Sequence, residues 1–238
     1  MLAKVAIIKS KTEEYQEVLK WLDRSLIRLL TKVANFKPND VKSFKLPAEL
    51  DMFPQFVFYL RRSPFIQNFN ASVDEITFYK ATLLHENVSN CTIMIQPVLY
   101  SYTAEEPDAT SVFLDIQNMK NDNVLFLDTF FNIVIWHSED VCAWREKGLH
   151  YEEEYTNIKQ MLESPQDYAQ QLLSERLPVS KLISCDAGSG QERHIKSVVD
   201  PSNSGSTSKV ISDGFASDDV ALQKFMEYLI RVVTTSNS

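Results

Sequence analysis

One short segment gathers residues that could act on a ligand or partner. It reads Gly-Ser-Gly-Gln-Glu-Arg-His over residues 188–194. Two glycines within three residues favour a sharp turn, and the polar neighbours of Arg193 predict that its side chain points outward. A guanidinium is always charged and presents a planar set of donors that suits phosphate and carboxylate oxygens. On residue types alone, however, an ordinary turn with a surface arginine explains this pattern better than a binding site does.

The histidines and cysteines predict neither a metal site nor a disulfide framework. The histidines stand far apart along the chain, and none forms an HxH or HxxxH pair: His85, His137, His150 and His194. The cysteines are odd in number and form no CxxC pair: Cys91, Cys142 and Cys185. Zinc needs three or four ligands close together. We therefore expect these residues to be structural, and Cys142, beside Trp144, to be a small core residue.

Composition and charge exclude several functional classes. The 238 residues include 24 Lys and Arg against 32 Asp and Glu, which gives a net charge of −8. A general basic surface for nucleic acid is therefore not expected. Only 5 glycines occur, too few for a glycine-rich nucleotide-binding architecture. No apolar run approaches the roughly 20 residues that span a bilayer, and no signal peptide opens the chain. These features predict a soluble, reduced, cytosolic globular protein.

The first third of the sequence is predicted to be helical. Apolar residues recur with a helical period over residues 13–35. A second helix is expected over residues 52–62, because the residue before Pro64 avoids the helical region. A third begins near Asp74, with Ser72 as its N-cap.

From about residue 88 the pattern changes to strands rich in β-branched and aromatic residues. Strands are expected over residues 91–103, 112–116 and 179–185, and a hairpin over 124–137, which is too long for one average strand. Helices are expected over 139–147, 152–162 and 165–176, an extended or mixed element over 191–199, and a final amphipathic helix after Asp218 and Asp219. This order predicts an α+β fold, in which helices pack against one mixed sheet.

Seven long stretches, in the same order along the chain, carry a resemblance to a known family. They are EVLKWLDRSLIRLL (17–30), PQFVFYLRRSPFIQNFN (54–70), IMIQPVLYSY (93–102), VLFLDTFFNIVIW (124–136), AWREKG (143–148), GSGQERHIKSVVDPS (188–202) and DDVALQKFMEYL (218–229). They closely resemble the C-terminal part of the GTPase-activating subunit of the COPII inner coat. The resemblance implies the tail of an all-helical domain over residues 1–88 and a gelsolin-like domain over 89–238. It places the family's zinc finger upstream of this chain, so no cofactor is expected here.

The same resemblance implies a function in endoplasmic-reticulum-to-Golgi transport. The family stimulates GTP hydrolysis by a small Arf-like GTPase and donates an arginine in trans. Arg193 matches that arginine, and Gln191, Glu192 and His194 are candidates for contact with the GTPase. A donated guanidinium stabilises the negative charge that phosphoryl transfer spreads over the phosphate oxygens. The protein would then be no enzyme itself, since it supplies one residue to the active site of another protein.

Several residues near Arg193 depart from the family pattern. Glu192 stands where the family usually has a small residue, and its carboxylate could pair with Arg193 and hold it back. His194 and Lys196 replace apolar residues, and Asp200 replaces the usual asparagine. The local geometry of the arginine is therefore the main question for the structure.

The resemblance also implies partners and leaves alternatives open. The implied partners are the GTP-bound GTPase, the cargo-binding subunit of the inner coat, an outer-coat subunit and proline-rich segments. Nucleic acid is not among them, and membrane association would be peripheral, at endoplasmic reticulum exit sites and COPII vesicles. An alternative is a gelsolin-like scaffold that binds proline-rich coat or cargo-receptor segments without catalysis. Actin or phosphoinositide binding, by analogy with true gelsolin domains, is disfavoured by the acidic composition and the absence of a calcium-loop pattern.

Overall fold

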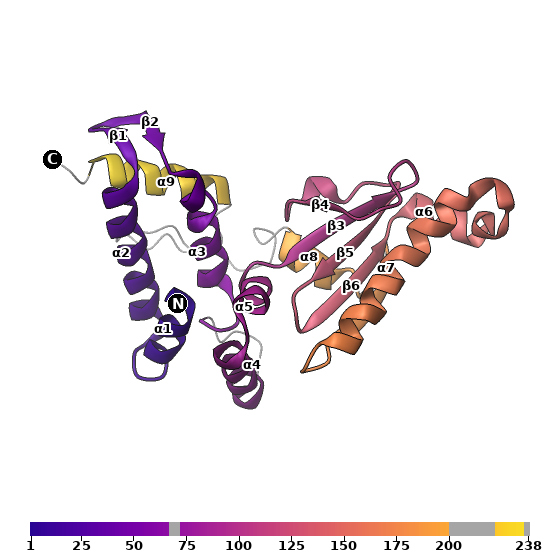
Figure 1. The fold of residues 1–238 in the computed structure, drawn as a ribbon, viewed down its shortest axis with the longest axis horizontal. Coiled ribbons are helices and arrows are strands. Elements are labelled where there is room, and N and C mark those ends of the chain that lie inside the picture. The colour runs from indigo at the N-terminus through magenta and orange to yellow at the C-terminus, as the bar shows by residue number, and fades with distance from the viewer. Residues whose placement is uncertain (67–71, 200–221, 236–238) are drawn as a thin grey trace. The chain divides into compact units, whose positions relative to one another are not determined.

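The computed structural model describes residues 1–66, 72–199 and 222–235, which fall into two compact units (Figure 1). The first unit comprises Met1–Val88 together with the helix near the C-terminus, and the second comprises Ser89–Ser204. Within the described ranges, no helix is both long and apolar enough to cross a bilayer.

The first unit is built mainly on helices. They are α1 (Leu2–Lys9), α2 (Tyr15–Val33), α3 (Phe53–Arg62), α4 (Val73–His85) and α9 (Leu222–Thr235), with a short 3₁₀ turn, η1 (Ala48–Leu50). The N-cap of α4 is Ser72, as predicted, and its hydroxyl accepts a hydrogen bond from the Glu75 N–H at 3.2 Å.

The last helix does not pack where the sequence placed it. Residues 89–238 were expected to form one domain, but α9 lies across α2 and α3 of the first unit (Figure 1). The apolar stripe of α9 is the reason, because its Phe225, Leu229 and Val233 are buried against Leu26 of α2 and Phe58 of α3. The preceding Asp218 and Asp219 lie outside the described residues.

The first unit is also not all-helical, contrary to expectation. A two-stranded antiparallel hairpin, β1 (Asn35–Lys37) and β2 (Asp40–Lys45), follows α2. Its turn holds Asn39 at a φ of 61°, a left-handed conformation that asparagine tolerates better than most residues. The Asn39 N–H donates to the Thr234 carbonyl of α9 at 3.1 Å.

The second unit contains the mixed sheet that the sequence predicts. Its strands are β3 (Val98–Thr103), β4 (Thr110–Val112), β5 (Asn123–Asp128), β6 (Asn132–His137) and β7 (Lys181–Asp186), in the order β4-β3-β5-β6-β7. All neighbours are antiparallel except β6 and β7, which run parallel. The predicted hairpin over residues 124–137 is confirmed as β5 and β6.

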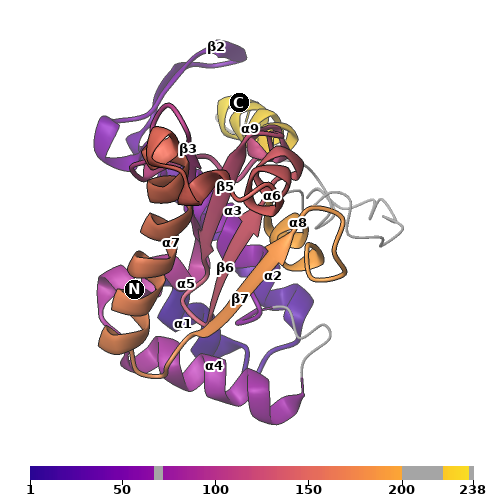
Figure 2. The same cartoon turned by 90° about the vertical axis from the view of Figure 1, so that its right-hand side faces the viewer.

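Helices cover both faces of this sheet. The helices of this unit are α5 (Val88–Ile95), α6 (Glu139–Glu146), α7 (Thr156–Glu175) and α8 (Arg193–Val199), with 3₁₀ turns η2 (Ile116–Asn118), η3 (Leu149–Tyr151) and η4 (Glu153–Tyr155). Of these, α7 and α8 cover the two faces of the sheet. Figure 2 shows α7 and α8 on opposite sides of the sheet. The alternation of β5 explains this arrangement, because Phe126 belongs to the core under α7 whereas Leu125 belongs to the core under α8.

Several expected elements of this unit are wrong in type or extent. The strand expected over 112–116 is instead β4, which ends at Val112. Residues 91–95 belong to α5 rather than to a strand. The two helices expected over 152–162 and 165–176 are the single helix α7, since Met161, Pro165 and Ala169 are all buried on one face and this burial outweighs the missing N–H of the proline. The extended or mixed element expected over 191–199 is instead helix α8 from Arg193 to Val199, and its Ile195 and Val199 are buried at helical spacing.

Candidate functional site

The candidate site lies at the start of α8, where the chain leaves the edge strand β7. Gly188 turns the chain with a φ of 76°, a value that suits glycine. Arg193 is the first residue of α8, and its side chain is exposed, as the sequence predicts. Among the described residues it makes no hydrogen bond or ion pair. Its guanidinium is therefore available to the anionic oxygens of a partner.

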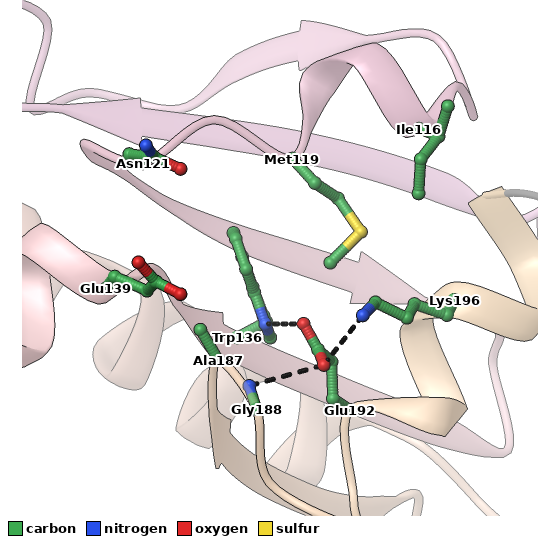
Figure 3. A pocket seen from close by; sticks show the side chains of 9 residues that line it. All are labelled: Ile116, Met119, Asn121, Trp136, Glu139, Ala187, Gly188, Glu192 and Lys196. Carbon is green, nitrogen blue, oxygen red and sulfur yellow. Dashed lines mark hydrogen bonds and ion pairs between the residues drawn. The ribbon is translucent and has the colours of Figure 1, made fainter.

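Glu192 does not hold Arg193 back. Its Oε1 accepts from Trp136 Nε1 at 3.2 Å, and its Oε2 accepts from the Gly188 N–H at 3.3 Å and from Lys196 Nζ at 2.8 Å (Figure 3). Residues four apart share one helix face, whereas adjacent residues diverge. The carboxylate therefore pairs with Lys196, and we call this set of contacts the Glu192 clamp.

The residues around Arg193 differ in how accessible they are to a partner. As a residue Glu192 is only 9% exposed, so little of it is accessible for direct contact with a GTPase. Gln191 is exposed and His194 is partly exposed, so both remain available. Burial, followed by the charges of Arg193 and Lys181, lowers the pKa of His194, which keeps its imidazole neutral at physiological pH.

A pocket of about 370 Å³ opens beside the clamp (Figure 3). Its lining combines apolar and charged side chains: Ile116, Met119, Asn121, Trp136, Glu139, Ala187, Gly188, Glu192 and Lys196. Sequence reasoning missed both this pocket and the role of Trp136, which precedes Glu192 by 56 residues. No local pattern signals the contact, because the pairing of β6 with β7 creates it.

A second polar cluster anchors the end of β7 before the turn. Asp186 accepts from Arg145 Nη2 at 2.6 Å and lies 3.2 Å from His137 Nδ1. Burial and the Arg145 charge lower the pKa of His137, although Asp186 opposes them. Burial would raise the pKa of Asp186, but Arg145 holds it below its usual range. The Ala187 N–H donates to the His137 carbonyl at 2.8 Å, which joins this cluster to the turn.

The remaining chemical candidates do not form a reactive centre. Burial raises the pKa of Cys185 to about 11 and that of Cys142 above its ordinary value, so both thiols are protonated at neutral pH. In the described ranges, no three His, Cys, Asp or Glu side chains gather closely enough to hold a metal ion. Chemically, the arrangement offers one exposed guanidinium on an anchored helix start.

Two comparisons place this structure among known proteins. Residues 1–93 match the family model of the Sec23/Sec24 helical domain. The chain also matches a solved structure, that of the human COPII-coat protein Sec24c, with a TM-score of 0.73 and 13% sequence identity. The match covers 100% of this chain and 31% of that one, so the chain spans about a third of the length of this relative. At this identity the likeness concerns the fold.

Proposed function

We propose that the chain belongs to the Sec23/Sec24 family, whose helical-domain model matches residues 1–93, and that it is part of a COPII coat subunit that activates a small Arf-like GTPase through Arg193. The single observation that carries this proposal is the state of the Arg193 side chain. It is exposed and unpaired among the described residues, yet it starts a helix whose preceding residue is buried and bonded to the sheet.

The proposed chemistry is stabilisation of a transition state in trans. Phosphoryl transfer spreads negative charge over the γ-phosphate oxygens and the leaving oxygen, and an arginine supplied by an activator is worth about 10³–10⁵ in rate. Its planar donors match two oxygens at once. Because this charge develops during the reaction, the guanidinium accelerates hydrolysis more than it strengthens binding.

The other arginines of the second unit support the choice of Arg193. Arg145 is bonded to Asp186, and Arg176 forms two hydrogen bonds with the buried Asp128. Either one would have to leave a carboxylate before it could reach a nucleotide. Arg193 needs no such exchange.

The partners and location follow from the family and belong to the same proposal. The coat subunit would join the cargo-binding subunit of the inner coat and an outer-coat subunit on the cytoplasmic side of endoplasmic reticulum exit sites. A second candidate function is a scaffold without catalysis that binds proline-rich coat or cargo-receptor segments. The match to Sec24c concerns the fold and is compatible with this candidate as well.

Single-turnover hydrolysis by the GTP-loaded GTPase tests the proposal. In the intact protein, Arg193→Ala should slow stimulated hydrolysis by at least about a hundredfold, a bound below the usual range for such arginines. Arg193→Lys should restore little, because an ammonium lacks the planar fork. Arg28→Ala is the matched control, since it removes an exposed arginine from α2. A wild-type rate for Arg193→Ala with intact binding would leave the scaffold function in its place.

A further inference from the structure

We propose that Glu192 is a positioning residue for Arg193, acting through the Glu192 clamp rather than through contact with the GTPase. This inference rests on the proposed function of Arg193. It concerns a residue at which this chain departs from the family pattern, where a small side chain is usual.

The clamp joins three separate parts of the unit at one carboxylate. Trp136 belongs to β6 in the sheet, Gly188 belongs to the turn, and Lys196 lies one turn further along α8. The bonds from Trp136 and Gly188 reach different oxygens of the same side chain. One residue therefore fixes the turn and the start of the helix to the sheet at the same time.

The clamp is held more firmly than a surface ion pair. The Glu192 side chain is 12% exposed, and its tryptophan partner is 4% exposed as a residue. A hydrogen bond to a charged group in such surroundings contributes more than a neutral or exposed one. Only Lys196, whose side chain is 52% exposed, faces solvent.

The backbone repeats the same restraint. The Glu192 N–H donates to the Ser189 carbonyl at 3.1 Å, and the Glu192 carbonyl accepts from the N–H groups of Ile195 and Lys196 at 3.2 and 3.1 Å. Ile195 is fully buried in the core under α8. The Cα of Arg193 therefore lies between two fixed residues, Glu192 and Ile195, while the Arg193 side chain makes no bond among the described residues.

Fixing that Cα matters because catalysis depends steeply on placement. A displacement of about 1 Å can cost roughly a hundredfold in rate when it moves a catalytic group. Without the clamp, the first residues of α8 could move after the glycine turn, and Arg193 could take many positions. This freedom would have to be lost when the guanidinium reaches the phosphate. The clamp removes this freedom before the GTPase binds.

The test compares the maximal rate of stimulated hydrolysis with the GTPase concentration that gives half of it. In the intact protein, Glu192→Ala should lower the maximal rate at least about tenfold and leave the half-saturating concentration within about twofold. Glu192→Gln should lie between Glu192→Ala and wild type, because an amide oxygen can still accept one of the hydrogen bonds but cannot form the ion pair. Trp136→Phe removes the indole N–H that donates to Glu192 and should therefore also lower the maximal rate.

The matched control is Glu139→Gln. Glu139 lines the same pocket and undergoes the same chemical change, but it makes no contact with the clamp. It should leave both kinetic quantities unchanged. Amide hydrogen exchange at Gly188 gives a readout independent of the GTPase. It should quicken in Glu192→Ala and Trp136→Phe but not in Glu139→Gln.

The outcomes separate this inference from the proposed function. If Arg193→Ala abolishes stimulation while Glu192→Ala keeps the wild-type maximal rate, the positioning role is wrong and the arginine finger stands. If Arg193→Ala itself hydrolyses normally, the proposed function fails first. A rise in the half-saturating concentration alone would make Glu192 a binding residue and overturn the inference.

Discussion

Arg176 and Arg193 lie in the same unit in opposite surroundings. Arg176 follows α7 and is buried, with its Nη1 and Nη2 at 2.7 and 2.6 Å from the two oxygens of Asp128. Arg193 begins α8, is exposed, and has no partner among the described residues. A buried guanidinium must be paired, because an unpaired charge there is very costly. The comparison indicates that the paired Arg176 stabilises the unit, whereas the exposed Arg193 is available to bind a partner.

The largest expected effect on stability comes from breaking the buried pair. Arg176→Ala leaves the Asp128 carboxylate buried without its cation, and the loss should be about 3–5 kcal/mol in the free energy of unfolding. Arg193→Ala should change the same quantity by no more than about 0.5 kcal/mol, as is usual for exposed residues. Urea unfolding of both variants checks the difference. An equal loss in the free energy of unfolding for the two variants would contradict the difference inferred between these arginines.

An intermediate case sharpens the comparison. The side chains of Arg145 and Asp186 are 38% and 43% exposed, against 8% and 3% for Arg176 and Asp128. Water can replace the lost partner at such a site, so Arg145→Ala should cost only about 1 kcal/mol. The same unfolding experiment measures it. If Arg145→Ala lowered the free energy of unfolding as much as Arg176→Ala does, the exposure of an ion pair would not determine the size of the loss.

The smallest effect is a pH dependence carried by His137. Burial, then the Arg145 charge, lowers its pKa from the ordinary value of 6.5, so the unfolded chain takes up a proton more readily than the folded one. The contribution of His137 is therefore present above pH 6.5 and is lost as the pH falls through its lowered pKa.

The measurement is urea unfolding at several values between about pH 7.5 and 5.5. Wild type should lose stability as the pH falls, and His137→Gln should lose less over the same interval. The groups that act on the His137 imidazole are Arg145, Asp186 and the backbone of Cys185, and the nearby Cys142 thiol donates to the His137 carbonyl. All of them remain in the variant. An unchanged slope in His137→Gln would assign the dependence to other groups.

The sequence predicted those features that depend on periodicity and local chemistry. The α+β class, the hairpin of β5 and β6, the Ser72 cap and the exposure of Arg193 all follow from patterns within a few residues. The predicted type of element was wrong where tertiary burial determines the conformation. In α8, for example, the two buried residues Ile195 and Val199 are also compatible with an extended element.

The candidate site could be predicted only in part, for a similar reason. The position of Arg193 after a glycine turn is a local feature, and its match to the family arginine came from resemblance. The partners of Glu192 depend on the pairing of β6 with β7 and on the helical spacing to Lys196. The sequence alone therefore suggested an ion pair between Glu192 and Arg193, whereas in the structure Glu192 pairs with Lys196.

The central claim is that the Arg193 guanidinium acts on charge that develops in the transition state of GTP hydrolysis. The most direct measurement is the affinity of the intact protein for the GTPase loaded with GDP and aluminium fluoride, which mimics that state, compared with a non-hydrolysable GTP analogue. Arg193→Ala should bind the mimic at least about a hundredfold more weakly than wild type does, since interactions specific to the transition state reach this size. Both proteins should bind the GTP-analogue form almost equally. Equal affinity of wild type and Arg193→Ala for the mimic would contradict the claim.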